Sequence, residues 1–118
     1  MSLYPKGAVI SVPCSFETSL QAQTDVRFPG RVLCTKAKAV VTKALAGTDA
    51  GIVAIKNAAG ATVGTITIPL SSALDVEVSV DLTANTIVEA NSFLRVDPSK
   101  ATAGGSCTVL VEYQNIGK

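Results

Sequence analysis

The side chains with the clearest chemical potential are two carboxylates, Asp75 and Glu77, in the segment DVEVSV (residues 75–80). A pair of carboxylates is the minimum set for acid–base hydrolysis of a glycoside. Residues two apart on one strand lie roughly 7 Å from each other. The alternation with valine puts both carboxylates on a solvated face, without the apolar pocket that a catalytic acid requires. We therefore expect no glycosidase here.

Other sequence patterns give no better catalytic centre. The chain has no histidine, which removes the usual general base and the usual metal ligand. No serine lies in a GxSxG elbow, and the segment GTDAG (residues 47–51) lacks the GxxxxGK[ST] frame of a phosphate loop. Asp49 is interpreted as a turn residue that caps its own backbone, because the oxygen donors of a calcium loop are missing around it. We expect no enzyme, no cofactor and no metal.

Cys14, Cys34 and Cys107 are widely spaced, and the sequence has no CxxC pair. An odd number of cysteines without histidine does not make a zinc site. We expect buried, reduced thiols that behave as small hydrophobic residues in a protein folded in a reducing cytosol. The alternative is one disulfide with a free thiol left over.

Composition predicts one domain, residues 1–118. Hydrophobic residues make up 47% of the chain but aromatics only 4%, so small and β-branched side chains form most of the core, which suits closely packed sheets. The formal net charge of +1, with lysine and arginine spread along the chain, gives no footprint for nucleic acid. The first residues are too short and too polar a run for a signal peptide or membrane span, so we expect neither.

Periodicity and turn chemistry predict about eight strands and no long helix. Pro13 follows the first strand, which we therefore expect to be an edge strand or to end there. Pro29-Gly30 forms a turn. The expected strands are Ala8 to Val12, Thr24 to Phe28, Arg31 to Lys43, Gly51 to Asn57, Ala61 to Ile68, Asp75 to Val80, Phe93 to Asp97, and Cys107 to Tyr113.

Two of these segments carry predictions about which side chains face the core. In the strand from Arg31, burying the face that holds Lys36 and Lys38 would desolvate two ammonium groups. We therefore expect the other face inside: Leu33, Thr35, Ala37, Ala39 and Val41. The hairpin between Lys43 and Pro69 is predicted to be the middle pair of the sandwich, with a second set of residues in the core: Ile52, Ala54, Ile66 and Ile68.

Short strands at spacings of roughly ten to fifteen residues predict an all-β fold, an antiparallel β-sandwich. Long connections between several strands favour a jelly roll. The alternative is an immunoglobulin-like sandwich. Short polar arms are expected at residues 1–7 and 114–118.

The order GRVLCTKAKAVV, ALAGTDAGIVAIKNAAGATVGTITIP, LTANTIVEANSFLRVD and CTVLVEY resembles the capsid decoration, or cement, proteins of tailed bacteriophages. The resemblance covers roughly Thr24 to Tyr113. Ala90-Asn91 departs from the Gly-Asp that often precedes the next strand in such patterns. The resemblance implies a β-sandwich that is made in the bacterial cytoplasm, binds the major capsid protein on the outside of the virion as a homotrimer, and stabilises the lattice.

Partner-binding residues are expected on the terminal arms and on the lysine face of the strand from Arg31. They are Tyr4, Lys6, Lys36, Lys38, Gln114 and Asn115. A solvated strand face is the simpler interpretation of the two central lysines. The alternative function is a receptor- or glycan-binding module of a phage tail or spike, for which the five aromatic residues provide few stacking surfaces.

Overall fold

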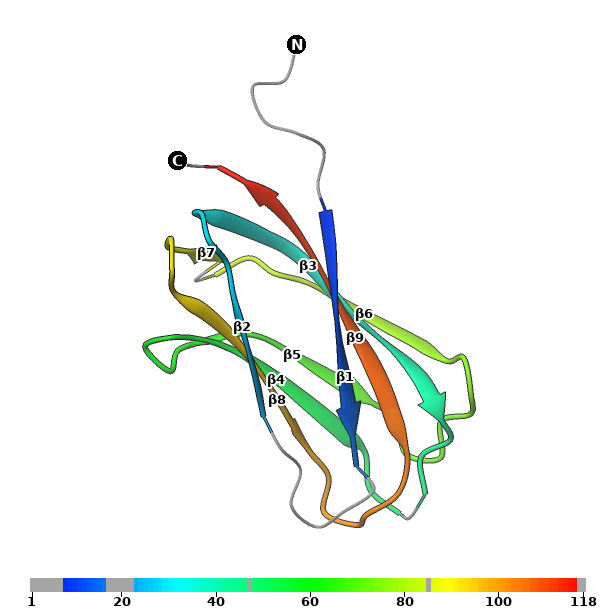
Figure 1. Ribbon diagram of the computed structural model, residues 1–118. Helices are drawn as coiled ribbons and strands as arrows, with labels where there is room; N and C mark the ends of the chain where they lie inside the picture. The colour runs from blue at the N-terminus through cyan, green and yellow to red at the C-terminus, as the bar shows by residue number, and fades with distance from the viewer. Residues whose placement is uncertain (1–7, 17–22, 47, 85, 117–118) are drawn as a thin grey trace.

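Two antiparallel sheets pack face to face in the computed structural model, which describes residues 8–16, 23–46, 48–84 and 86–116 (Figure 1). The first sheet has the order β1 (Ala8–Ser15), β9 (Ser106–Asn115), β3 (Val32–Lys43) and β6 (Glu77–Asp81), with the short β7 (Ile87–Val88) also paired to β3. The second has the order β2 (Thr24–Arg27), β8 (Phe93–Ser99), β4 (Gly51–Asn57) and β5 (Thr62–Ile68). Helices do not occur in these described ranges.

Strand pairing identifies the sandwich as a jelly roll. Apart from β7, the pairs are nested along the chain: β4 with β5, β3 with β6, β2 with β8, and β1 with β9. A long antiparallel ribbon with the β4–β5 hairpin at its tip gives this order when it is rolled into two sheets. An immunoglobulin-like sandwich would place β1 beside β2 in one sheet, and the structure places them in different sheets. The all-β sandwich prediction is confirmed.

The core lies between the sheets and is built from small and β-branched side chains. Ala37, Ala39 and Val41 of β3 face it from one sheet, and Val53 and Ile55 of β4 from the other, all fully buried. Small residues let the sheets approach closely, while the branched ones fill the space between them. Leu94, Val96, Cys107, Val109 and Val111 also point inward.

A β-bulge in β3 changes its buried face. The register against β9 shifts between Cys34 and Lys36, so Thr35 is the extra residue. Because side chains alternate with a period of two, this insertion exchanges the faces on its two sides. Ala37, Ala39 and Val41 are buried as predicted, but before the bulge Val32 and Cys34 are buried, whereas Leu33 is half-buried and Thr35 exposed.

The central hairpin departs from prediction in two respects. Ile66 and Ile68 of β5 are in the core, but in β4 Val53 and Ile55 are inside while Ile52 is exposed and Ala54 half-buried. Every residue from Ile52 to Ile55 is apolar, so alternation could not choose the face. In addition, β5 is an edge strand of its sheet, so the hairpin is not the middle pair.

Strand β1 is an edge strand, as Pro13 indicated, and it continues through Pro13 to Ser15. Pro13 pairs with Thr108 and is exposed, which an edge strand tolerates because the missing N–H points away from its neighbour. At the other terminus β9 runs to Asn115, so Gln114 and Asn115, expected in an arm, belong to a strand. The arm expected at residues 1–7 lies outside the described residues.

Candidate functional site: the loop end of the sandwich

The connections that follow β3, β5 and β8 meet at one end of the sandwich, drawn at the bottom of Figure 1. We call this the loop end and define it as residues 44–46, 48–50, 69–76 and 100–105. Backbone hydrogen bonds join the connections: the N–H of Leu45 donates to Ser72 O at 2.9 Å, and that of Ala46 to Gly104 O at 3.4 Å. Residues far apart in the sequence therefore form one surface.

Residues 69–76, the leucine loop, consist of two consecutive β-turns. The N–H of Ser72 donates to Pro69 O at 3.3 Å, and the N–H of Val76 to Ala73 O at 3.2 Å. The third residue of each turn has a positive φ, 60° at Ser71 and 71° at Asp75. This is the pattern of a type II turn, in which glycine is usual at that position. A non-glycine residue there costs about 1–2 kcal/mol.

Contacts with β3 and its continuation hold these turns in place. The N–H of Asp75 donates to Val41 O at 2.8 Å, and the N–H of Val41 donates to Val76 O at 2.9 Å. The hydroxyl of the buried Ser72 donates to Pro69 O at 2.6 Å. Strained backbone persists only where its surroundings fix it, and these bonds supply that constraint.

The leucine loop presents apolar side chains to solvent. Leu70 and Leu74 each occupy the second position of a turn and are 55% and 59% exposed, and Val76 beside them is 37% exposed. A single exposed leucine is ordinary on a protein surface. Two leucines on one anchored loop form an apolar surface whose backbone is already ordered, which suits protein binding.

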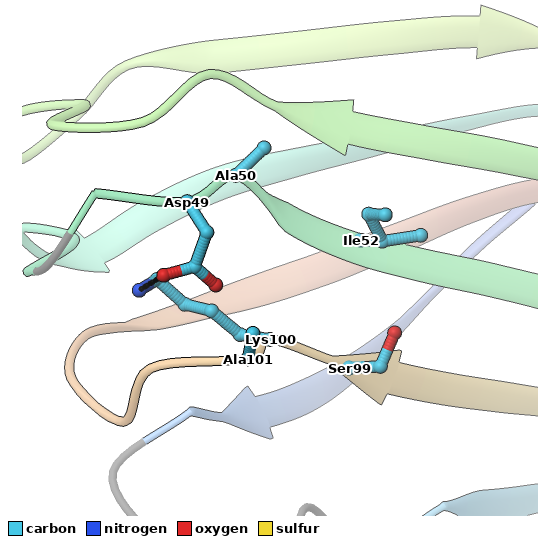
Figure 2. A pocket seen from close by; sticks show the side chains of 6 residues that line it. All are labelled: Asp49, Ala50, Ile52, Ser99, Lys100 and Ala101. Atoms are coloured by element: carbon cyan, nitrogen blue, oxygen red, sulfur yellow. Dashed lines mark hydrogen bonds and ion pairs between the residues drawn. The ribbon is translucent and has the colours of Figure 1, made fainter.

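A buried lysine joins the other two connections of the loop end. The side chain of Lys100 is fully buried and reaches across to the connection after β3 (Figure 2). Its ammonium donates to the carbonyl of Ala46, to Thr102 O at 2.7 Å and to the Asp49 carboxylate at 3.3 Å. An ammonium has three donors, and these three acceptors come from both connections. Lys100 is therefore a cross-link between loops.

Asp49 completes this cluster by capping a different loop. Its second carboxylate oxygen accepts a hydrogen bond from the Thr102 N–H at 3.1 Å. That backbone bond, with help from Lys100, holds the pKa of Asp49 below its usual range. The expectation that Asp49 caps its own backbone is corrected, because its partners lie on the connection after β8. An open depression of about 410 Å³ lies beside it, with Ile52 and Ser99 on its wall (Figure 2).

Chemically, the loop end is suited to binding a surface, because it exposes apolar side chains on a backbone that is held by hydrogen bonds. The Asp49 carboxylate is committed to a lysine and a backbone N–H. Within the part of the chain that the structure describes, no three His, Cys, Asp or Glu side chains are grouped to hold a metal ion.

The lysines predicted to bind a partner lie on the outer face of the first sheet. Lys38 approaches Glu77 at 3.6 Å and Glu112 at 3.7 Å, and Lys36 approaches Asp81 at 3.8 Å. Carboxylates on neighbouring strands therefore match both positive charges. Such exposed pairs contribute about 0–1 kcal/mol each.

The remaining predicted residues belong to the terminal segments. Gln114 and Asn115 are exposed at the end of β9, where they pair with Leu33 and Val32. Tyr4 and Lys6 lie outside the described residues. The four described positions therefore all lie on strands β3 and β9 of the first sheet, and none of them belongs to the loop end.

Among the residues that the structure describes, the aromatic side chains are largely engaged in contacts within the protein. Phe16 and Phe28 are buried, and the ring of Tyr113 meets that of Phe28 edge-on at 5.1 Å. The guanidinium groups of Arg27 and Arg95 lie over the ring of Phe93, on the second sheet, at 5.1 and 5.2 Å from its centre. A sugar that stacked on this ring would compete with these cation–π contacts.

Among known proteins, no family model matches the chain, and no curated protein matches it. A chain of the cyanophage Pam1 capsid asymmetric unit has a similar structure, with a TM-score of 0.55 and 13% identity over 94% of this chain and 86% of that chain. The shared property is the fold. A chain from the disulfide-linked pili of Bacillus endospore appendages is less similar, with a TM-score of 0.47 and 11% identity over 95% of this chain and 88% of that chain.

Sequence reasoning missed the leucine loop and the Lys100 cluster. The segment from Leu70 to Leu74 lies between two expected strands, and two of its five residues are leucines. Leucines in a segment with turn residues, outside any strand pattern, are a signal that could have indicated an exposed apolar surface. No local signal marks Lys100, because its burial depends on loops that are distant in the sequence.

Proposed function

We propose that this protein is a non-enzymatic structural component of a phage virion that decorates the outer surface of the capsid and stabilises it by binding the major capsid protein. The observation that carries the proposal is the jelly-roll fold, which matches a chain of a phage capsid asymmetric unit over most of both chains. Jelly rolls recur in viral capsid domains. The resemblance of the sequence to phage decoration proteins supports the same assignment independently of the fold.

The loop end is the proposed docking surface, with the capsid lattice as its occupant. Leu70 and Leu74 are displayed on a backbone that is already fixed by hydrogen bonds. Binding through such a loop loses little conformational entropy, so modest apolar burial gives useful affinity. A lattice offers many identical sites, and a homotrimer engaging several of them gains further through avidity.

The homotrimer is part of the proposal, with neighbouring copies in contact through the terminal segments. Gln114 and Asn115 are exposed at the end of β9, away from the loop end. Tyr4 and Lys6 are the corresponding contacts proposed for the N-terminal segment. Lys36 and Lys38 contribute at the rim, where an acidic partner would compete with Glu77, Asp81 and Glu112 for them. Sedimentation velocity of the purified chain measures the oligomeric state.

Mass spectrometry of purified virions tests the location. We expect a copy number comparable with that of the major capsid protein. Capsids assembled without this protein should lose integrity at a lower temperature than complete ones, because binding to the folded lattice stabilises it by mass action. When both are diluted into progressively lower salt, the capsids without it should also break first. A few copies per virion would instead indicate a tail or spike module, and equal robustness of the two kinds of capsid would remove the cement role.

Co-sedimentation with undecorated capsids tests the docking surface. We expect the double variant Leu70→Ser, Leu74→Ser to bind at least tenfold more weakly, since each leucine loses roughly 1.5–3 kcal/mol of apolar burial when it is replaced. Val9→Ser is the matched control, because Val9 is 55% exposed but lies on edge strand β1. If the control lowers binding as much as the double variant, the docking surface is not the loop end.

A further inference from the structure

Two of the three thiols face each other across neighbouring strands. Cys14 of β1 is the direct partner of Cys107 of β9, and the two strands lie side by side in the first sheet (Figure 1). Both side chains point into the core, 5% and 1% exposed. Neither side chain is joined in a disulfide in the structure. Cys34, the third, lies on β3 opposite Tyr113.

Pro13 fixes the type of this pair. Proline has no N–H, so Pro13 and Thr108 cannot exchange two hydrogen bonds and must be a non-hydrogen-bonded pair. Pairs alternate along an antiparallel ladder, so Cys14 and Cys107 form a hydrogen-bonded pair, with Cα atoms about 5.5 Å apart. Disulfides span Cα separations of about 4.4–6.8 Å. The backbone therefore already has the spacing that a disulfide requires.

We propose that Cys14 and Cys107 are a built-in oxidation site, which closes to a cross-strand disulfide when the folded protein meets a small-molecule disulfide such as oxidised glutathione. The inference rests on strand register and burial, and it holds whatever the function of the protein. It would matter most for a chain that folds in a reducing compartment and then leaves it, because disulfides persist only in oxidising surroundings.

The reaction takes two exchange steps. The Cys14 thiolate attacks one sulfur of glutathione disulfide, which forms a mixed disulfide and releases one glutathione thiolate. Cys107 then loses its proton, and its thiolate attacks the Cys14 sulfur and displaces the second glutathione. The two protein thiols give up two electrons and two protons, and the glutathione disulfide that accepts them becomes two glutathione thiols.

The environment of the pair favours Cys14 as the first nucleophile. A hydrogen bond from the Cys107 thiol lowers the pKa of Cys14, and the same contact with burial raises the pKa of Cys107. Cys14 also lies on the edge strand, which is paired only to β9 in the described sheet. An edge strand separates from its sheet more readily than a central one, which lets the oxidant reach the sulfur. By contrast, burial raises the pKa of Cys34 to about 11, which disfavours its thiolate.

Oxidation of the intact, folded chain tests the proposal. After full reduction, the protein is incubated in excess oxidised glutathione, and its free thiols are then alkylated in denaturant. Intact mass should show one alkylated thiol in place of three, and peptide mapping should join Cys14 to Cys107. The disulfide closes a long loop, so the melting temperature should rise by on the order of 10 °C, less any strain.

Three variants sharpen the test. Cys34→Ala should keep the disulfide and the rise in melting temperature, whereas Cys14→Ala and Cys107→Ala should lose both. Oxidation of the urea-unfolded chain gives the random pairing expected without a fold. The proposal is overturned if the native protein keeps three free thiols, stops at glutathione adducts, or forms a bond that includes Cys34. Wild-type mapping decides the matter even if a variant fails to fold.

Discussion

The connections after β4 and after β8 lie at opposite ends of the second sheet, since these strands are antiparallel neighbours, and they are closed in different ways. Residues 58–61 close on themselves. The Asn57 side-chain oxygen accepts hydrogen bonds from the N–H groups of Ala59 at 3.1 Å and Ala61 at 2.9 Å. Residues 100–105 close on other loops, through the buried Lys100 and through Gly104, whose N–H donates to Phe16 O at 2.6 Å.

This difference teaches where stability is local and where it is shared. A turn held by its own side chain can form and open without affecting the rest of the sandwich. The loop end forms only when several connections are in place together, so a change there should destabilise the whole domain. The proposed docking leucines belong to the shared end, because the leucine loop is bonded to Leu45 and to β3.

Removing the buried ammonium should have the largest effect. Lys100→Met keeps the aliphatic stem but leaves the Asp49 carboxylate and the Ala46 and Thr102 carbonyls without this donor. A buried polar group left without its partner costs about 1–3 kcal/mol, and because three acceptors lose their donor here we expect a total loss of about 3–5 kcal/mol. The free energy of unfolding in urea should fall by that amount.

Lys56→Met provides the matched control for that experiment. Lys56 lies near the opposite end, 3.9 Å from Asp97, and both side chains are about one-third exposed. An exposed pair contributes about 0–1 kcal/mol. Equal losses for the two lysine variants would contradict a structural difference between the ends.

Two glycine variants compare the ends through the backbone. Gly105 has a φ of 102°, and a Cβ there would lie 2.8 Å from the Leu45 Cα and 3.1 Å from the Ala44 carbonyl. Gly60 has a φ of 89° with open space around it. We expect Gly105→Ala to cost about 2–4 kcal/mol, from left-handed strain plus a clash. Gly60→Ala should cost about 1 kcal/mol, from strain alone. Thermal and urea unfolding of the pair measure the difference.

Sequence predicted the architecture well, because strand spacing, turn residues and the position of Pro13 are local signals. It failed where a single residue changes a register. The bulge at Thr35 exchanges the faces of β3, and nothing at Thr35 itself distinguishes it from an ordinary strand residue. In β4 the run Ile52 to Ile55 is apolar on both faces, so only packing against the other sheet selects Val53 and Ile55.

The loop end was beyond prediction for a related reason. Lys100 and Asp49 are about fifty residues apart in the sequence, and only the jelly-roll pairing of β4 with β8 brings their loops together. A lysine in a segment of small polar residues looks like a solvated loop residue. Its burial depends on acceptors that the sequence does not place beside it.

The turn at residues 58–61 depends most directly on the side chain of Asn57. Asn57→Ala removes the side-chain oxygen that accepts from Ala59 and Ala61, and we expect a loss of about 1 kcal/mol in urea unfolding. Asn57→Asp retains an acceptor and should recover most of that loss. If alanine costs as much here as Lys100→Met does at the loop end, the 58–61 turn is not independent of the rest of the fold.

The smallest effect should appear in acid, at Asp49. The pKa of this carboxyl is lowered in the folded protein, chiefly by the Thr102 N–H. A group with a lowered folded pKa stabilises the protein above its ordinary pKa, and that stabilisation is lost as the pH falls through the folded value. Asp49→Asn should therefore be less stable than the wild type at neutral pH, with the gap closing below the ordinary pKa of 3.8.

Asp25 is the control that separates an effect of acid on the loop end from an effect of acid elsewhere in the protein. Hydrogen bonds from Arg95, at 2.8 and 3.2 Å, lower the pKa of Asp25 in the same direction. The difference in stability between Asp25→Asn and the wild type should therefore also become smaller in acid. However, Asp25 and Arg95 connect β2 with β8 and not the connections of the loop end. Amide hydrogen exchange at neutral pH distinguishes the two variants. Asp49→Asn should speed exchange at the amides of Leu45 and Ala46 in the loop end. Asp25→Asn should leave those amides protected, because Asp25 makes no contact with the connections of the loop end.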